Sequence, residues 1–174
     1  MENLFKGIHN LSLDSKGRLG IPITYRDHIM GLLKGSMVIT IDTEEKCLLL
    51  YPSSVWSKIQ DKISNLPSFN KNARRIQRLL IGHAEDIDVD SSGRILISKP
   101  LREYASLSKK IILIGQGEKF EIWDQGSWNE NVEMWREEAT SVDDEEALSD
   151  LSICLLYTSP SPRDSALSRM PSSA

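Results

Sequence analysis

An eight-residue motif occurs twice in this chain of 174 residues, and no other feature constrains the fold as strongly. The sequence Asp-Ser-Lys-Gly-Arg-Leu-Gly-Ile at residues 14–21 returns as Asp-Ser-Ser-Gly-Arg-Ile-Leu-Ile at residues 90–97. The same offset of 76 positions carries Arg26 onto Arg102. Because such a repeat is typical of a duplicated structural unit, we expect two related halves of about 50 residues each.

Each copy of the motif predicts two short strands joined by a tight turn. Apolar and polar residues alternate on both sides of the turn, with the period of two that half-buried strands show. An aspartate at the first turn position and a glycine at the fourth are typical of a type I turn. The turn-forming residues are Asp14 and Gly17 in the first copy and Asp90 and Gly93 in the second.

The remainder of each half also follows one pattern. A short helix is predicted over residues 23–33 in the first half and 99–106 in the second, and two further strands follow each helix. A unit of this size buries too little apolar surface to be stable alone. We therefore expect an α+β, β-rich fold in which two pseudo-symmetric halves interlock into one shared β core.

Between the halves, residues 56–83 form an insert that predicts a pair of helices. Ser53 or Ser54 is placed to cap the first helix, and Asn70 to cap the second, which runs to Gly82. The second helix carries four basic residues at spacings of three and four, which places them on one stripe: Lys71, Arg74, Arg75 and Arg78. The stripe is a solvated face, an interface with a neighbouring subunit or a contact with nucleic acid, and we favour the interface over a nucleic-acid contact.

The formal charge of −4 is the sum of three unequal segments. Residues 1–128 carry a net +3, residues 129–153 a net −8 and residues 154–174 a net +1. An acidic chain argues against a nucleic-acid partner. Here, however, the acidity belongs to one segment, for which we expect an acidic C-terminal helix or a frayed end. The repeated body is mildly basic.

Residues 154–174 are not expected to belong to the fold. Serine and proline are frequent there, and no apolar periodicity follows Tyr157, which is typical of a disordered tail. The stretch Cys-Leu-Leu-Tyr-Thr-Ser-Pro-Ser-Pro-Arg-Asp at residues 154–164 also resembles one reading frame through a sequencing-library adapter. We therefore expect the natural protein to end near Ile153.

Nothing in the sequence predicts an enzyme, a metal site or a cofactor. The three histidines have no paired spacing, and the common metal, nucleophile and phosphate-loop motifs are missing. His9 and His83 are expected to be hydrogen-bonded structural residues, and Cys47 a buried core residue. Because the only other cysteine is Cys154, and no apolar run is long enough to span a bilayer, we expect a reducing cytoplasmic compartment.

The arginines that follow the turns need another explanation. The pattern Asp-x-x-Gly-Arg alone is only a hairpin turn with an exposed side chain. Here it occurs at the same place in both halves, and a second arginine follows eight residues later in each. Turn geometry does not explain why an arginine stands at positions 18 and 94, nor why Arg26 and Arg102 follow. A guanidinium just beyond a tight turn suits phosphate oxygens or a guanine edge, so we expect a surface that contacts nucleic acid.

Motifs in both halves resemble those of the MraZ family, which are bacterial transcriptional regulators with two tandem AbrB/SpoVT-like domains. The resemblance covers residues 4–153. It rests on Leu4-Phe-Lys-Gly7, Asp14-Ser-Lys-Gly-Arg18, Ile21-Pro22 with Arg26, Cys47-Leu-Leu-Leu-Tyr-Pro52, Arg75-Ile-Gln-Arg-Leu-Leu-Ile-Gly82, Asp90-Ser-Ser-Gly-Arg94 and Phe120-Glu-Ile-Trp-Asp124.

The resemblance implies an organisation and a partner. The swapped-hairpin domains would occupy residues 7–55 and 84–128, separated by the helical insert at 56–83 and followed by the acidic segment at 129–153. The family implies a cytoplasmic, nucleoid-associated ring of identical subunits that binds double-stranded DNA at repeated promoter sites. Its target would be the division and cell-wall gene cluster, including its own gene, with repression favoured over activation. Neither a membrane nor a small-molecule substrate is implied.

The resemblance also assigns roles by matching positions. Arg18 and Arg94 become the leading DNA contacts, with Lys16, Arg26 and Arg102 as support. In the second copy, a serine stands at the position equivalent to Lys16. The second turn is therefore less basic, and the two halves need not contribute equally to binding.

Two other functions stay open at this point. An AbrB-like antitoxin would bind DNA and mask a toxin partner, with residues 130–150 as the masking segment. Such antitoxins typically carry one Gly-Arg unit in a short chain, so two units in tandem argue against this function. A purely structural assembly is the third alternative, and it would not retain promoter DNA at moderate salt.

Overall fold

The structure is a computed structural model that describes residues 5–31 and 33–139. The chain divides into two compact units, Met1–Asn131 and Val132–Ala174, and both repeats lie in the first. The acidic segment beyond residue 139 and the tail at residues 154–174 lie outside the described residues. No helix in the described ranges is long and apolar enough to cross a membrane.

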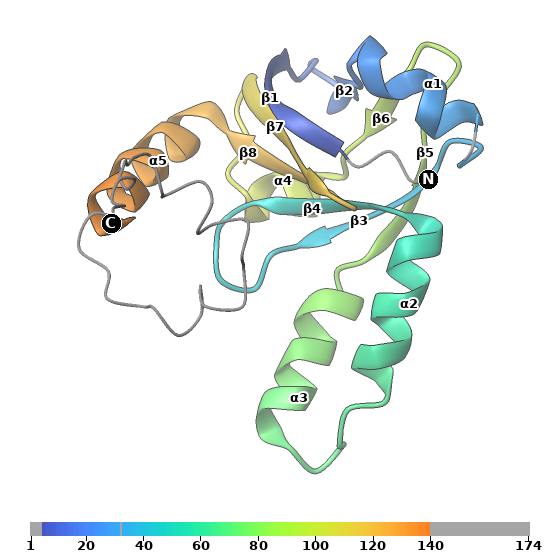
Figure 1. The fold of residues 1–174 in the computed structure, drawn as a ribbon, viewed down its shortest axis with the longest axis vertical. Coiled ribbons are helices and arrows are strands. Elements are labelled where there is room, and N and C mark those ends of the chain that lie inside the picture. The colour runs from blue at the N-terminus through green and yellow to red at the C-terminus, as the bar shows by residue number, and fades with distance from the viewer. Residues whose placement is uncertain (1–4, 32, 140–174) are drawn as a thin grey trace, which may run out of the picture. The chain divides into compact units, whose positions relative to one another are not determined.

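The two repeats fold into the same order of elements, which is strand, strand, helix, strand, strand (Figure 1). The first repeat comprises β1 (Phe5–Ser12), β2 (Arg18–Gly20), α1 (Ile23–Gly31), β3 (Ser36–Ile41) and β4 (Leu48–Pro52). The second comprises β5 (Glu85–Asp88), β6 (Arg94–Leu96), α4 (Lys99–Tyr104), β7 (Lys110–Gly117) and β8 (Phe120–Asp124). The duplicated α+β organisation predicted from the repeat is confirmed.

The two halves exchange strands. Six strands form one antiparallel sheet in the order β1-β7-β8-β4-β3-β5. Strand β1 of the first half pairs with β7 of the second, and β5 of the second half pairs in the equivalent way with β3 of the first. Strands β4 and β8 join the halves at the centre of the sheet, and β2 and β6 form a separate two-stranded ribbon. The shared β core follows from these reciprocal pairings.

One large hydrophobic core is built by the sheet, the ribbon and helices α1 and α4. Leu19 and Ile95 are paired at the middle of the ribbon and are 0% and 1% exposed. Phe5 stacks on Phe120 with ring centroids 4.1 Å apart, and Tyr25 meets Phe120 nearly edge-on at 4.9 Å. Burying a large apolar side chain contributes about 1.5–3 kcal/mol. Leu19 and Ile95 therefore hold the ribbon against this core, and the Tyr25–Phe120 contact holds α1 against the sheet.

The residues predicted to be structural have structural partners. His9 Nε2 lies 2.9 Å from the Tyr25 hydroxyl, and His83 Nδ1 lies 2.8 Å from the Leu79 carbonyl oxygen. Cys47 is completely buried, as expected of a core residue. His9 is half-buried and His83 is exposed, so of the three only Cys47 belongs to the core.

The insert forms a helical pair that extends from the sheet, as Figure 1 shows: α2 (Ser53–Ser64) and α3 (Lys71–Ile76). Asn70 caps α3 as predicted, because its side chain accepts hydrogen bonds from the backbone of the first turn. The predicted serine cap on α2 is wrong. Pro52 occupies that cap position, and the Ser53 Oγ instead lies 2.7 Å from the Ser36 Oγ.

The second helix of the insert does not continue as an ordinary α-helix to Gly82. It passes into one π-helical turn, η1 (Gln77–Ile81), which the regular 3.6-residue pattern does not predict. The Gln77 side-chain amide donates to the Ile63 carbonyl oxygen at 3.0 Å, and Thr40 Oγ1 donates to the Leu80 carbonyl oxygen at 2.6 Å. These bonds tie the turn to α2 and to the central sheet.

The last described element is the helix α5 (Gln125–Ala139). It confirms that a C-terminal helix follows the second repeat. Asp124 precedes it, and the Asp124 side chain accepts the backbone N–H of Gly126 at 3.1 Å, as an N-terminal cap does. In the second unit, exposed Glu133 and Arg136 form an ion pair at 3.7 Å.

Candidate nucleic-acid interface

Both predicted turns adopt the same hydrogen-bonded loop. The Gly17 N–H donates to the Asp14 carbonyl oxygen at 3.1 Å, and the Gly93 N–H donates to that of Asp90 at 2.9 Å. These bonds join the first and fourth positions, as a type I turn requires. The two glycines have φ angles of +87° and +76°, in the left-handed region that disfavours side chains. Each glycine therefore ends its turn in a conformation that few other residues adopt.

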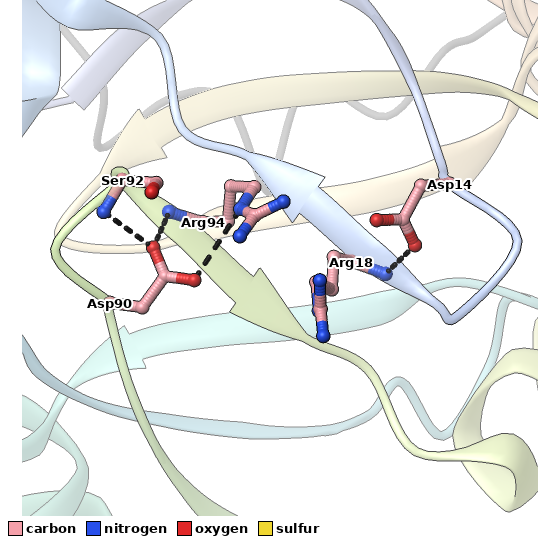
Figure 2. A network of polar contacts seen from close by, with 5 residues as sticks. All are labelled: Asp14, Arg18, Asp90, Ser92 and Arg94. Carbon is pink, nitrogen blue, oxygen red and sulfur yellow. Dashed lines mark hydrogen bonds and ion pairs between the residues drawn. The ribbon is translucent and has the colours of Figure 1, made fainter.

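The aspartates hold these loops with their side chains as well. Asp14 Oδ1 accepts the backbone N–H groups of Lys16 and Arg18 at 2.9 and 2.8 Å. Asp90 Oδ1 accepts those of Ser92 and Arg94, both at 2.9 Å (Figure 2). Each carboxylate thus orients the backbone of the arginine that ends the loop.

These hydrogen bonds also favour the ionised carboxylates. The backbone N–H of Arg18 lowers the pKa of Asp14, and it outweighs the opposing effect of desolvation. The backbone N–H of Arg94 lowers the pKa of Asp90 in the same way. The loops consequently keep their acceptors charged at neutral pH and lose this stabilisation only as the pH falls through the lowered pKa values.

The register of the β2–β6 ribbon places Arg18 and Arg94 on one face. Arg18 is opposite Leu96, and Gly20 is opposite Arg94. Directly paired residues of antiparallel strands project to the same side, whereas the intervening Leu19–Ile95 pair projects into the core. Arg18 and Arg94 are therefore diagonal neighbours on the outer face, and Figure 2 shows their side chains beside each other across the two strands.

The two arginines differ in their local partners. Arg94 Nε lies 3.4 Å from Asp90 Oδ2, with the side chains 38% and 44% exposed. That nitrogen is buried and makes no well-aligned hydrogen bond, so the contact is an ion pair alone. Within the described ranges, the Arg18 guanidinium forms no equivalent pair with Asp14. Arg18 is thus the more available of the two donors.

Leu96 is a candidate contact residue that the sequence analysis does not identify. It lies opposite Arg18 on the outer face of the ribbon and is 56% exposed. The repeat contains the signal, because Leu96 stands where the first half has Gly20. An apolar residue at an outward position of a short strand is therefore specific to the second half.

Arg26 and Arg102 lie beneath the turns and are both half-buried. Arg26, on α1, donates its Nε–H to the Ile21 carbonyl oxygen at 2.6 Å. Arg102, on α4, donates its Nε–H to the Ile97 carbonyl oxygen at 3.0 Å. The structure brings both arginines to the turn region, each with one nitrogen engaged by the backbone of its own half.

The remaining basic residues fall into two groups. Lys16 is exposed on the first turn, two residues before Arg18. The helical stripe of Lys71, Arg74, Arg75 and Arg78 is also exposed, on α3 and η1. Figure 1 shows the helical pair on the opposite side of the six-stranded sheet from the β2–β6 ribbon. The stripe is therefore a separate surface from the turns.

A single group of three potential metal-ligating side chains occurs in the described part of the chain: Asp42, Cys47 and Glu121. Structural hydrogen bonds already use the carboxylates. Asp42 accepts the Glu44 backbone N–H at 2.8 Å, and Glu121 accepts the Trp123 indole N–H at 2.9 Å. Burial strongly raises the pKa of the Cys47 thiol, and nearby carboxylates add to this effect. Because a metal binds the thiolate, this buried group is a poor metal site.

Comparisons with known proteins agree with the duplicated structure. A family model described as "MraZ protein, putative antitoxin-like" matches residues 4–79 and again residues 80–151. Three similar proteins all bear the name "Transcriptional regulator MraZ". They are from Alkalilimnicola ehrlichii (50% identical over 136 residues, 78% of this chain and 91% of that protein), Legionella pneumophila strain Corby (50% over 141 residues, 81% and 93%) and Coxiella burnetii strain Dugway (49% over 132 residues, 76% and 87%).

Proposed function

The chain belongs to the MraZ family of transcriptional regulators, and from this premise we propose that it binds repeated double-stranded DNA sites upstream of its own gene. It is a regulator and not an enzyme. The target in this proposal is the division and cell-wall gene cluster, and the effect is repression. The proposal places the protein in the cytoplasm, associated with the nucleoid.

The outer face of the β2–β6 ribbon is the proposed DNA-binding surface. The observation that carries the proposal is the diagonal placement of Arg18 and Arg94 on this face, each held at its backbone by an aspartate. A two-stranded ribbon fits the major groove, where arginine recognises guanine O6 and N7. Lys16 adds a phosphate contact at the rim, and Arg26 and Arg102 support the turns.

Arg18 is proposed as the stronger contact of the two. Among the described residues it forms no ion pair like that of Arg94, which must leave Asp90 before it reaches a base or a phosphate. Lys16 further strengthens the first turn, since its counterpart is Ser92. We therefore propose that the first half contributes more to binding than the second, a possibility that the less basic second turn already leaves open.

Leu96 adds an apolar element to the same surface. Thymine presents a methyl group in the major groove, and an exposed aliphatic side chain contacts it favourably. Leu96 lies opposite Arg18, so both face the groove together. This combination favours a site in which a thymine lies close to a guanine.

A ring of identical subunits accounts for tight binding from a small surface. Each chain offers only a few phosphate and base contacts, and each phosphate contact adds a modest, salt-dependent contribution. When several chains engage repeated sites together, the later contacts form at a high effective concentration. The proposed ring therefore converts weak individual contacts into specific promoter binding.

The basic stripe on α3 and η1 is proposed to contact a neighbouring subunit in that ring. Its position away from the ribbon separates it from the proposed DNA surface. The charge-reversed variant Arg74→Glu/Arg75→Glu should reduce the size of the assembly measured by light scattering, with Lys58→Glu on α2 as an exposed control. A variant that assembles normally but binds DNA less tightly would contradict this assignment.

A footprint on the upstream region of its own gene tests the proposed function. The expected result is protection of several short, evenly spaced segments that share one sequence. Competition with scrambled duplex of equal length should leave the pattern unchanged. Uniform retardation of both duplexes without protected segments would contradict sequence-specific regulation.

A further inference from the structure

The two supporting arginines, Arg26 and Arg102, approach the turns of the opposite halves. A Cβ placed on Gly17 would lie 2.8 Å from Arg102 Nε, and one placed on Gly93 would lie 2.7 Å from Arg26 Cζ. Real Cβ atoms essentially never approach other heavy atoms this closely. Each turn glycine therefore leaves room for the arginine of the other half.

The backbone makes the same crossed connection. The Ile97 N–H donates to the Gly17 carbonyl oxygen, and the Ile21 N–H donates to the Gly93 carbonyl oxygen, both at 2.8 Å. Ile97 and Ile21 are also the residues whose carbonyl oxygens accept the Nε–H of Arg102 and of Arg26. One residue of each half thus bonds to the opposite turn through its N–H and to its own arginine through its carbonyl oxygen.

This arrangement connects each supporting arginine with one DNA-contacting arginine. Gly17 directly precedes Arg18, and Gly93 directly precedes Arg94. Arg102 therefore packs against the residue that precedes Arg18, and Arg26 packs against the residue that precedes Arg94. The constant spacing of eight residues between the two arginines of each repeat has the same origin, because each half supplies both a turn and the arginine for the opposite turn.

We propose that Arg26 and Arg102 are crossed positioning residues, each of which holds the DNA-binding turn of the other half in its bound conformation. The proposal rests on the proposed DNA surface and adds the route by which these two arginines support it. A guanidinium suits this role better than an ammonium, because its Nε–H bonds the carbonyl oxygen while its Nε and Cζ atoms lie against the glycine.

Direct phosphate contact is the competing role for these arginines, and lysine distinguishes the two. Arg102→Lys keeps the positive charge but loses the Nε–H and the planar face. If Arg102 contacted phosphate, lysine would retain most of the affinity. If Arg102 positions the first turn, lysine should lower promoter affinity by about 2- to 10-fold, which is the range expected for the loss of one hydrogen bond.

A crossed set of double variants identifies which turn each arginine supports. The loss of promoter affinity caused by Arg102→Lys should disappear in an Arg18→Ala background, because the contact that Arg102 positions is already gone. The same loss should persist in an Arg94→Ala background. Arg26→Lys should show the reverse pattern. Arg136→Lys, at an exposed position of α5, serves as the control for a change of one exposed arginine. Equal losses in both backgrounds would overturn the crossed assignment.

Hydrogen–deuterium exchange of the DNA-free protein tests the positioning role without reference to DNA. Each turn contains four hydrogen-bonded backbone N–H groups, within residues 14–18 and 90–94. Arg102→Lys should accelerate exchange in residues 14–18 and leave 90–94 unchanged, and Arg26→Lys should do the opposite. Arg102→Gln provides a second variant that should give the same pattern. The proposal is overturned if exchange accelerates in the turn of the half that carries the substituted arginine, in both turns or in neither turn.

The two measurements separate this inference from the proposed function. If crossed exchange is observed while Arg18→Ala leaves DNA binding intact, the positioning role stands and the DNA surface is wrong. If Arg18→Ala weakens DNA binding while the lysine variants leave exchange in the turns unaffected, the DNA surface stands and the crossed role is wrong.

Discussion

Arg94 Nε lies 3.4 Å from Asp90 Oδ2, and the structure shows no equivalent pair between the described residues Arg18 and Asp14. The two repeats are otherwise alike in this loop, with the same hydrogen bonds to the aspartate Oδ1. The Arg18 guanidinium is therefore the more available donor, whereas the Arg94 guanidinium is held by the Asp90 carboxylate. If the ribbon is the DNA surface, as proposed, we expect the carboxylate of Asp90 to limit DNA binding.

Asp90→Asn is therefore expected to raise DNA affinity by about two- to five-fold, as the release of one exposed ion pair allows. Asparagine keeps an oxygen that accepts the two backbone N–H groups, but it removes the charge that holds Arg94 and repels phosphate. Fluorescence anisotropy with the upstream duplex measures the change. Asp14→Asn is the matched control and should give a smaller gain, so equal gains would contradict a specific role for the ion pair.

Leu96→Ala should weaken binding to the cognate site and relax the preference for thymine opposite this position. The expected loss is a few-fold, about the effect of one methyl contact, with the melting temperature unchanged because the side chain is 56% exposed. Ile8→Ala on strand β1 is a suitable control, since Ile8 is 57% exposed. Equal binding of thymine and uracil duplexes by the unmodified protein would contradict the methyl contact.

Glu121→Gln is expected to stabilise the fold at neutral pH. Glu121 is 9% exposed, and burial raises its pKa above the ordinary value of 4.5, more than the hydrogen bond from Trp123 lowers it. A raised carboxyl pKa means that stability is present in full below about pH 4.5 and declines as the pH rises through the folded-state pKa. Glutamine removes this decline and keeps an acceptor for the indole.

The melting temperature of both proteins between pH 4 and pH 8, roughly the range over which a raised carboxyl titrates, checks this expectation. The advantage of Glu121→Gln should grow with pH. Glu118→Gln, in the neighbouring exposed turn, controls for the loss of one negative charge. If the advantage is constant across the range, or if Glu118→Gln reproduces it, ionisation of Glu121 is not the cause.

The sequence predicts the turns well because their determinants are local. Asp14 and Gly17 specify their hydrogen bonds within four residues, and the second copy repeats both. The exchange of strands between halves was predictable from the small size of each unit. The failure of the predicted serine cap on α2 could not be predicted, because the Ser53 hydroxyl instead contacts the hydroxyl of Ser36, 17 positions away in the sequence.

The crossed contacts and the outer face of the ribbon depend on tertiary register. Leu96 becomes a candidate contact only once β2 and β6 are paired so that it lies opposite Arg18. The proximity of Arg102 to Gly17 likewise follows from the interlocking of the halves and from no local pattern. The π-helical turn at residues 77–81 also depends on such contacts, because tertiary hydrogen bonds to Ile63 and Thr40 accompany it.

The most direct test of the account is the affinity of Arg18→Ala for the duplex upstream of its own gene, measured by fluorescence anisotropy at several salt concentrations. We expect a loss of about 5- to 150-fold, which corresponds to one bidentate base contact, and a smaller loss for Arg94→Ala. The assembly size, measured in parallel by light scattering, should not change. Unchanged affinity of Arg18→Ala with an intact assembly would contradict the claim that the ribbon binds DNA.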